Sequence, residues 1–454
     1  MKRKVVSLLI IGAMVASMAA CGSSSDESSD STSSTASSGS EEAEEEVEVQ
    51  SDDENTLTVM AWDASFNIPA LEAAAADYKE NVNSDFNLEI IEQSGSSDIE
   101  TLITNVASDT SGNSISELPD IVLFQDHYFE QYLSDYPDVW QSLEDVDVDW
   151  DNFSEEKLSY STIDGVHWGM PVDSGTVIAA YRVDLLEEAG YTIDDLTGVT
   201  WDEFLDIGED VYNATGKYLL VMDGDGNDLF YIMLQAEGVS QFQDGEPYIT
   251  ENETLLEIVD VLVEANERNV LYLSNDWDGY TNEIIQGDMA AGIMNGNWII
   301  PTMEQVEENS GLWEITTLPT LSGEEGYASN GGSSLYITAN CSKVELAEDF
   351  LAYTFGGSTE TYDNALLDGG VVTTYAPAGE SDVYAEGVEF FNDTPIYQQI
   401  AEYTSHVQTI EQSSYHYSCR TYMAAALTNI LNGTDVDTAL QDAEDQLRFE
   451  MGLD

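Results

Sequence analysis

Two short segments of the chain combine aromatic rings with planar polar side chains. The first reads Trp62-Asp63-Ala-Ser-Phe66-Asn67, and the second reads Gln125-Asp126-His127-Tyr128. Aromatic rings can stack on a flat apolar face, while carboxylate, amide and imidazole groups exchange hydrogen bonds with hydroxyls. A pyranose ring offers both such a face and such hydroxyls, so these segments predict a sugar-binding surface. Buried partners for hydroxyls also select strongly, because a mismatched ligand leaves them unpaired.

Each of these segments follows a predicted strand. Residues 57–61 alternate between apolar and polar, as a half-buried strand does, and residues 120–124 form a short apolar run typical of a strand covered on both faces. Ligands of open α/β sheets bind beyond the carboxyl ends of strands, where both segments lie. A structural alternative stays open for each. Trp62 and Phe66 could belong to the core, and Asp126 could cap a helix.

Helices with recognisable starts alternate with these strands. Pro69 opens a helical pattern, and three later helices are predicted from capping pairs, which are Thr200 with Glu203, Thr250 with Glu253, and Ser342 with Glu345. This alternation favours an α/β fold with mostly parallel sheets. The roughly 400 residues after the N-terminal region exceed one ordinary domain, so two lobes are expected.

Residues 1–20 have the layout of a secretory signal. Three basic residues precede the apolar stretch Val5–Ala20, which is shorter than the roughly 20 apolar residues of a membrane-spanning helix. Its end, Met18-Ala-Ala-Cys21-Gly22, resembles a bacterial lipobox, although Met18 stands where leucine is usual. We therefore expect cleavage before Cys21 and a diacylglycerol on its thiol. Ordinary signal cleavage beside an incidental cysteine is the alternative.

Residues 21–55 predict a disordered tether. Gly22–Ser40 is nearly all small and polar, and Glu41–Glu54 is rich in carboxylates. Such a segment cannot bury enough apolar surface to offset its ordering entropy, and its like charges extend it. A disordered terminus without an anchor would have the same composition. The interpretation of this segment as a tether therefore depends on the lipobox alone. No later segment approaches a membrane span, so the lipid would be the only membrane attachment.

The charge of the chain excludes several classes of partner. Its 89 acidic residues against 11 basic ones give a formal net charge of −78. A nucleic-acid binder needs a basic footprint, which is absent, and the acids repel anionic lipid and phosphate. Solubility accounts for this charge. With so many acids, some carboxylate pairs are inevitable, so a pair alone is no sign of a site.

No metal or other cofactor is expected. Asp223–Asp228 begins like a calcium-binding loop, but Asp228 stands where glycine is needed and Leu234 where the closing glutamate belongs. The cysteines after Cys21, namely Cys341 and Cys419, do not have the spacing of a metal site. They are expected to be small core residues, with a single disulfide as the alternative.

Four further blocks occur in the order found in one protein family. They are His167–Gly190 with Thr200–Phe204, Gln286–Trp298, Leu318–Tyr353 and Leu431–Leu440. Together they resemble the family 1 extracellular solute-binding proteins, the relatives of the maltodextrin-binding protein, from about Leu57 onward. The resemblance implies the type II two-lobed α/β fold of periplasmic binding proteins, with a ligand cleft between the lobes and a hinge of several crossings.

The same resemblance implies the lobe boundaries and the function. Lobe I would comprise residues 56–173 and 333–385, and lobe II residues 174–332 and 386–454. Such a protein is the binding component of an ABC importer, a monomer that captures a carbohydrate without chemistry and delivers it to permease subunits. It would be lipid-anchored at the extracytoplasmic face of a cell membrane. The stalk and the few basic residues suggest a Gram-positive surface.

The resemblance also implies which residues hold the ligand. The expected ligand-binding residues are Trp62, Asp63, Phe66, Asn67, Gln125, Asp126, His127, Asp173, Asp228, Trp298, Tyr415, His416 and Tyr417. Trp298 matches a position that often carries a stacking tryptophan, with core packing as the alternative. Asn227 could reach the ligand in place of Asp228. His416 departs from the family pattern, and we place Tyr415 in the cleft and Tyr417 in the core.

Two other functions remain open. A surface glycoside hydrolase would need two carboxylates ~5 to 9.5 Å apart across the bond, and no motif singles out such a pair. A Ser-His-Asp site is also poorly supported, because no serine lies in a Gly-x-Ser-x-Gly segment. We therefore expect no enzyme. The second alternative is a binder of a polyamine or peptide, whose charge the acids would suit, although aromatic clusters fit sugars better.

Overall fold

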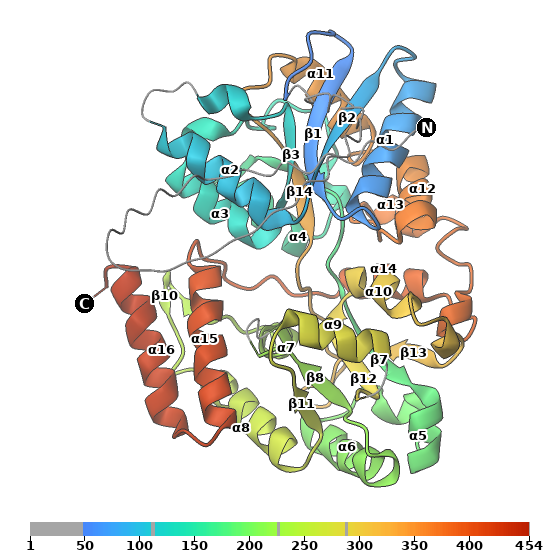
Figure 1. The fold of residues 1–454 in the computed structure, drawn as a ribbon, viewed down its shortest axis with the longest axis vertical. Coiled ribbons are helices and arrows are strands. Elements are labelled where there is room, and N and C mark those ends of the chain that lie inside the picture. The colour runs from blue at the N-terminus through green and yellow to red at the C-terminus, as the bar shows by residue number, and fades with distance from the viewer. Residues whose placement is uncertain (1–48, 110–113, 225–227, 287–288, 454) are drawn as a thin grey trace, which may run out of the picture.

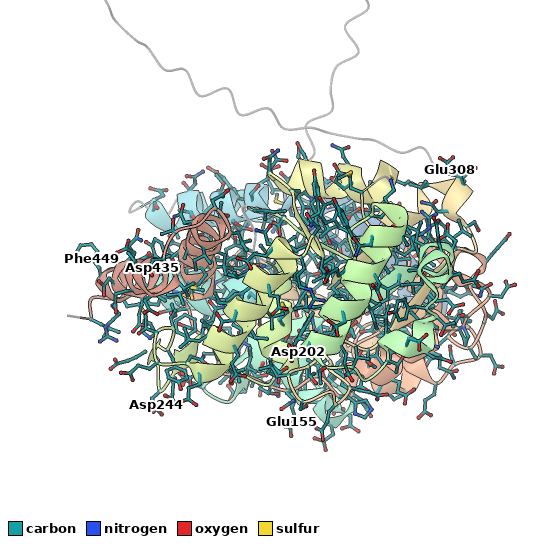
Figure 2. All side chains as sticks on the ribbon, turned by 90° about the horizontal axis from the view of Figure 1, so that it is seen from below. Glu155, Asp202, Asp244, Glu308, Asp435 and Phe449 are labelled. Atoms are coloured by element: carbon teal, nitrogen blue, oxygen red, sulfur yellow. The ribbon has the colours of Figure 1, made fainter. Side chains whose placement is uncertain are left out.

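A computed structural model describes residues 49–109, 114–224, 228–286 and 289–453. The signal, Cys21 and most of the predicted tether lie outside these residues. Two α/β bodies lie one above the other, joined by several passages of the chain (Figure 1). Among the described residues, no helix is long and apolar enough to cross a membrane. The acidic side chains labelled in Figure 2, such as Asp202, Asp244 and Asp435, point outward into solvent.

Lobe I is built on a five-stranded sheet. Its order is β2 (Asn87–Gln93), β1 (Thr56–Trp62), β3 (Ile121–Gln125), β14 (Ser333–Ile337) and β6 (Gly169–Pro171). Its helices are α1 (Asn67–Asn81), α2 (Ser96–Ser108), α3 (Asp126–Asp135), α4 (Glu155–Ser161), α11 (Val344–Tyr353), α12 (Thr359–Gly369) and α13 (Ala376–Gly379). A short hairpin joins β4 (Thr162–Ile163) to β5 (Val166–His167).

The central strands of this sheet are buried on both faces. In β3, Ile121 and Leu123 enter one hydrophobic cluster, whereas Val122 and Phe124 enter another on the opposite face. This confirms the prediction for residues 120–124. The half-buried strand expected at residues 57–61 is wrong, because Met60 packs in the second cluster and Thr58 is also fully buried. Thr58 fits there because its hydroxyl donates to Val49 O at 2.7 Å.

Lobe II contains a three-stranded antiparallel sheet in the order β12 (Gly292–Gly296), β7 (Val177–Arg182) and β13 (Trp313–Thr316). Beside it are the parallel pair β8 (Leu220–Met222) and β11 (Leu271–Leu273), and the hairpin of β9 (Phe242–Gln243) and β10 (Glu246–Pro247). The helices are α5 (Val183–Ala189), α6 (Trp201–Thr215), α7 (Asp228–Ala236), α8 (Glu253–Glu267), α9 (Trp277–Gln286), α10 (Ile300–Glu304), α14 (Ile396–Thr404), α15 (His416–Leu431) and α16 (Val436–Glu450).

The expectation of mostly parallel sheets is wrong. Among the described strands, β1 runs parallel to β2 and β3, and β8 runs parallel to β11, but the other pairs are antiparallel. The strands β6, β7 and β14 border the passages between the lobes. Their direction is therefore set by how the chain crosses, and not by a strand–helix–strand connection within one sheet.

One of the three predicted capping pairs is confirmed. Thr200 and Glu203 form a reciprocal capping box at the start of α6. At α8 the cap is Asn252, because the backbone and hydroxyl of Thr250 both donate to Glu444 of α16 at 2.7 Å. Helix α11 begins after Lys343 without a side-chain cap, so the prediction of Ser342 is also wrong. A distant acceptor thus replaces the local one at Thr250.

The last residues of the predicted tether are tied to lobe I. Gln50 Nε2 donates to Leu118 O at 3.1 Å, and Lys343 Nζ donates to Ser51 O at 3.0 Å. These bonds hold residues 50 and 51 on the lobe. The boundary of the tether at residue 55 stays a prediction.

Two neighbouring passages of the chain form the hinge. Residues 173–176 lie against residues 329–332, with Asn330 N donating to Gly175 O at 2.9 Å. Gly175 has a φ of 60°, and a Cβ there would lie 2.8 Å from the Gly331 carbonyl, so only glycine fits. A third passage runs through residues 371–384, whose apolar side chains pack partly on each lobe. The lobe boundaries, including that at residue 385, stay predictions.

Candidate functional site

The loop after β1 carries four of the predicted residues. Trp62 is partly buried, and Asp63 is exposed in a left-handed conformation with its side chain accepting from Ser65 N at 2.9 Å. Phe66 is buried in the lobe I core, as the structural alternative had it. Asn67 begins α1 and is buried, and within the described part of the chain its Oδ1 has no hydrogen-bond partner.

Asp126 and Asp173 belong to a buried polar network at the hinge. Asp126 pairs with Lys157 of α4, both being fully buried, and it also accepts from Ser334 Oγ at 2.7 Å. Asp173 accepts from Ser333 N at 2.9 Å. Burial raises the pKa of Asp126 to about 6, against the opposing charge of Lys157. Asp126 is therefore a hinge residue of α3, and its side chain does not cap that helix.

The N-terminal end of α15 meets α3 directly, so the two lobes are in contact there (Figure 1). His127 stacks on His416 with ring centroids 4.5 Å apart, and Tyr128 stacks on Tyr417 at 3.6 Å. Tyr417 Oη donates to Gln125 Oε1 at 3.1 Å. The structure thus brings together predicted residues from both lobes, and adds Tyr128 beside them.

Tyr415 and Tyr417 lie the other way round from their predicted places. Tyr417 faces lobe I, while Tyr415 packs partly buried on the lobe II core. The reason is helical: Tyr415 is the N-cap of α15, and Tyr417 lies on the side of the first turn that faces α3.

Asp228 and Arg420 form an ion pair at the junction of α7 and α15, with Arg420 almost fully buried. The guanidinium carbon of Arg420 lies 5.3 Å from the ring centroid of Tyr231 and 5.8 Å from that of Tyr417. Asn227, the alternative to Asp228, lies outside the described residues. Sequence reasoning missed Arg420 and Tyr231, since both occur inside helices. A single arginine among the otherwise uncharged residues of α15 was the signal available.

The two stacked histidines are neutral. Burial lowers the pKa of His127 to about 3 and that of His416 well below its usual value, and Arg420 adds to both effects. Within the described residues, neither His127 Nδ1 nor His416 Nε2 has a hydrogen-bond partner. The other ring nitrogen of His127, Nε2, is hydrogen-bonded to Tyr231 Oη at 3.1 Å.

These pKa shifts predict a loss of stability in acid. Below pH ~6.5 the unfolded state binds protons at both histidines, whereas the folded state keeps them neutral. The free energy of unfolding therefore has its full histidine contribution above that pH and loses it progressively as the pH falls toward 3. The variant His416→Phe keeps an aromatic ring for the stacking but cannot be protonated. Between pH 7 and pH 5, we expect its free energy of unfolding to fall by about 2 kcal/mol less than that of the wild type. Urea unfolding at both pH values measures this difference.

The raised pKa of Asp126 changes the free energy of unfolding with pH in the opposite direction. Both proteins share this effect, so it cancels when the variant is compared with the wild type. His406→Phe serves as the control for replacing a histidine by phenylalanine, because His406 is exposed on the surface. Equal losses for the wild type and His416→Phe would contradict the assignment of a neutral buried His416.

Trp298 occupies the lobe II side of the hinge. It lies in the short 3-10 helix Asn297–Ile299, and its indole Nε1 donates to Asn330 O at 2.8 Å. Its ring is partly buried and packs against hydrophobic clusters of both lobes. Asn330 Nδ2 in turn donates to Asn295 Oδ1 at 2.8 Å. The hydrogen bond to Asn330 and the contacts with both clusters fix the orientation of this ring at the hinge.

A separate cavity of about 960 Å³ lies between α4, α13 and α14. Hydroxyl, amide and acidic side chains line it, including Glu156, Thr373, Thr404 and Gln408. None of the predicted ligand-binding residues lines this cavity. We therefore base the candidate site on the aromatic and polar cluster, whose side chains suit a sugar, and not on the size of the cavity.

The described residues contain no group of three or more His, Cys, Asp or Glu arranged to hold a metal ion. Cys341 and Cys419 are both free and buried, one in each lobe, which confirms them as core residues.

Comparison with known proteins identifies the family. The model of the bacterial extracellular solute-binding proteins matches residues 73–392. The chain belongs to this family. An extracytoplasmic location follows, and the family consists of binding proteins and not of enzymes. The family predicted from the sequence is confirmed.

Several relatives of this solute-binding protein are known. The lactose-binding protein of Rhizobium radiobacter is 29% identical over 394 residues, covering 86% of this chain and 92% of the relative. The arabinooligosaccharide-binding protein of Bacillus subtilis is 25% identical over 219 residues, covering 46% of this chain and 49% of the relative.

Solved structures agree on the fold. The galacto-N-biose-/lacto-N-biose I-binding protein of Bifidobacterium longum superimposes with a TM-score of 0.70 at 18% identity, covering 89% of this chain and 99% of that one. A family 1 extracellular solute-binding protein gives a TM-score of 0.71 at 18% identity over 87% of this chain and 99% of its own. The predicted two-lobed type II fold of periplasmic binding proteins is confirmed.

Proposed function

We propose that this solute-binding protein captures a sugar or oligosaccharide between its lobes and delivers it to the permease of an ABC importer. The observation that carries the proposal is the match to a lactose-binding protein along 86% of the chain. The rings of Tyr231 and Tyr417 support it, since they lie beside Arg420 and Asp228 where the lobes meet. Trp298 is linked to Arg420 through Asn330, to which both side chains donate a hydrogen bond. Stacking faces beside charged hydrogen-bonding groups are what a pyranose requires.

Capture in this proposal is a hinge motion without chemistry. The glycine at position 175 and the paired passages 173–176 and 329–332 give the hinge its close backbone contact. The α3–α15 contact provides the closed arrangement, which ligand contacts would favour. The permease would then need a higher affinity for the closed form than for the open one. A partner that binds both forms equally well does not shift the equilibrium between them.

We also propose that a lipid on Cys21 anchors the protein at the surface of a Gram-positive cell, where it works as a monomer. The lipobox-like residues before Cys21 support the anchor. Labelling of cells with a radioactive fatty acid tests it, since Cys21→Ala should lose the label.

A thermal-shift screen tests the proposed function. A ligand that binds only the folded state stabilises it by RT ln(1 + [L]/Kd), or about 2.7 kcal/mol at a hundredfold excess over Kd. The panel contains lactose, arabinooligosaccharides, maltodextrins, their monosaccharides, spermidine and a peptide mixture. We expect a rise in melting temperature with one carbohydrate class, and recovery of that sugar uncleaved by chromatography. A shift with spermidine or peptides alone would overturn the proposal.

A further inference from the structure

Trp277 is one of few large hydrophobic side chains that the described surface leaves exposed, at 37%. Scattered exposed apolar residues are normal and need no explanation. Trp277 differs because it lies beside the candidate site. Its ring centroid is 5.8 Å from that of Trp298, with the two planes at 46°. We propose that Trp277 forms an outer sugar subsite next to Trp298, so that the ligand has at least two sugar units. This inference rests on the proposed function.

The position of the Trp277 ring is fixed from behind. The ring stacks on Tyr280 at 5.1 Å and 25°, and Tyr280 is buried. The start of α9 is tied down by Asp276, whose Oδ1 accepts from Gly279 N at 2.7 Å. A ring backed in this way needs little ordering when a ligand arrives, which favours binding.

The same platform is connected to the hinge. Tyr280 Oη accepts from Asn295 Nδ2 at 3.2 Å, and Asn295 Oδ1 accepts from Asn330, whose carbonyl binds the Trp298 indole. Trp298 therefore lies next to the hinge, and Trp277 lies farther toward solvent on the same surface. The order of the two rings, partly buried and then exposed, matches an inner and an outer subsite.

The angle between the rings decides the number of sugar units. One pyranose ring cannot stack on two planes inclined at 46° at once. Rotation about a glycosidic bond lets two successive units of an oligosaccharide tilt against each other, so that each can lie on its own ring. Stacking on a second exposed indole also adds affinity only when a second unit is present to cover it.

Calorimetry with a series of one, two and three sugar units tests the subsite, using the full chain solubilised in detergent. The series is built from the sugar class that raises the melting temperature. We expect Trp277→Ala to raise the Kd of the two- and three-unit sugars about tenfold or more, and to leave the Kd of the single unit within about twofold. Trp277→Phe should fall between wild type and Trp277→Ala.

Phe449→Ala is the matched control, because Phe449 is also an exposed aromatic residue and projects from the outer edge of the molecule on α16 (Figure 2). It should bind all three sugars as the wild type does. The subsite is overturned if Trp277→Ala leaves the longer sugars unaffected, if it weakens all lengths equally, or if the wild type binds the single unit as tightly as the longer ones. If the wild type binds no carbohydrate, the proposed function itself fails.

Discussion

Trp298→Ala is expected to weaken carbohydrate binding by about 100-fold, or roughly 2.7 kcal/mol. The ring lies between the hydrophobic clusters of both lobes, and its face is fixed by the hydrogen bond to Asn330. Truncation removes both the stacking plane and the contact that positions it beside the hinge. Truncating a large aromatic residue at the centre of an interface to alanine typically costs this much binding free energy.

Calorimetry on purified variants measures the loss. Trp298→Phe keeps a stacking plane without the indole donor, so it should lose less than Trp298→Ala. Trp150→Ala is the matched control, because Trp150 is a partly buried tryptophan of lobe I that stacks on His167, away from the candidate site. A Kd for Trp298→Ala within threefold of the wild type would show that this ring does not contact the ligand.

Lys157→Met is expected to reduce the free energy of unfolding by about 3 to 5 kcal/mol, because it leaves Asp126 as an unpaired buried charge. Asp126 cannot escape to water, since α3, α4 and the hinge segment enclose it. The pKa of Asp126 is already raised to about 6 with the lysine present, and removing the lysine raises it further. The loss should therefore be smaller at pH 5, where Asp126 is protonated, than at pH 8.

Urea unfolding of single and double variants measures this effect. Adding Asp126→Asn to Lys157→Met removes the buried charge and should recover part of the loss. Arg448→Met is the control, because it breaks a surface pair with Glu246 in which the two side chains are 30% and 56% exposed, and it should cost less than about 1 kcal/mol. A loss for Lys157→Met no larger than that of Arg448→Met would contradict a buried pair at the hinge.

The outcome at Lys157 also bears on function. Its Nζ donates to Ser333 O at 3.0 Å, where the second passage of the hinge enters β14. The double variant Lys157→Met with Asp126→Asn lacks this contact. If it folds and binds carbohydrate with the wild-type Kd, the pair only stabilises lobe I; a higher Kd would mean that the pair also holds the hinge in place.

The sequence by itself determined the features that depend on neighbouring residues. The apolar run at 120–124 predicts a strand buried on both faces, and the Thr200–Glu203 pair predicts the start of α6. Both are local, because strand alternation and helix capping join residues only a few positions apart. The ordered sequence blocks were likewise enough for the family and its two-lobed fold.

Only the tertiary structure decided which side chains meet. Gln125 and Tyr417 are hydrogen-bonded across 292 positions, and Thr250 is bound by Glu444 instead of its neighbour Glu253. Phe66 was predicted to bind the ligand because it is an aromatic residue next to Trp62 and Asp63. In the structure its side chain is buried in the hydrophobic cluster between α1 and the sheet of lobe I. Such contacts depend on the path of the chain between the lobes, and a sequence pattern a few residues long carries no information on that path.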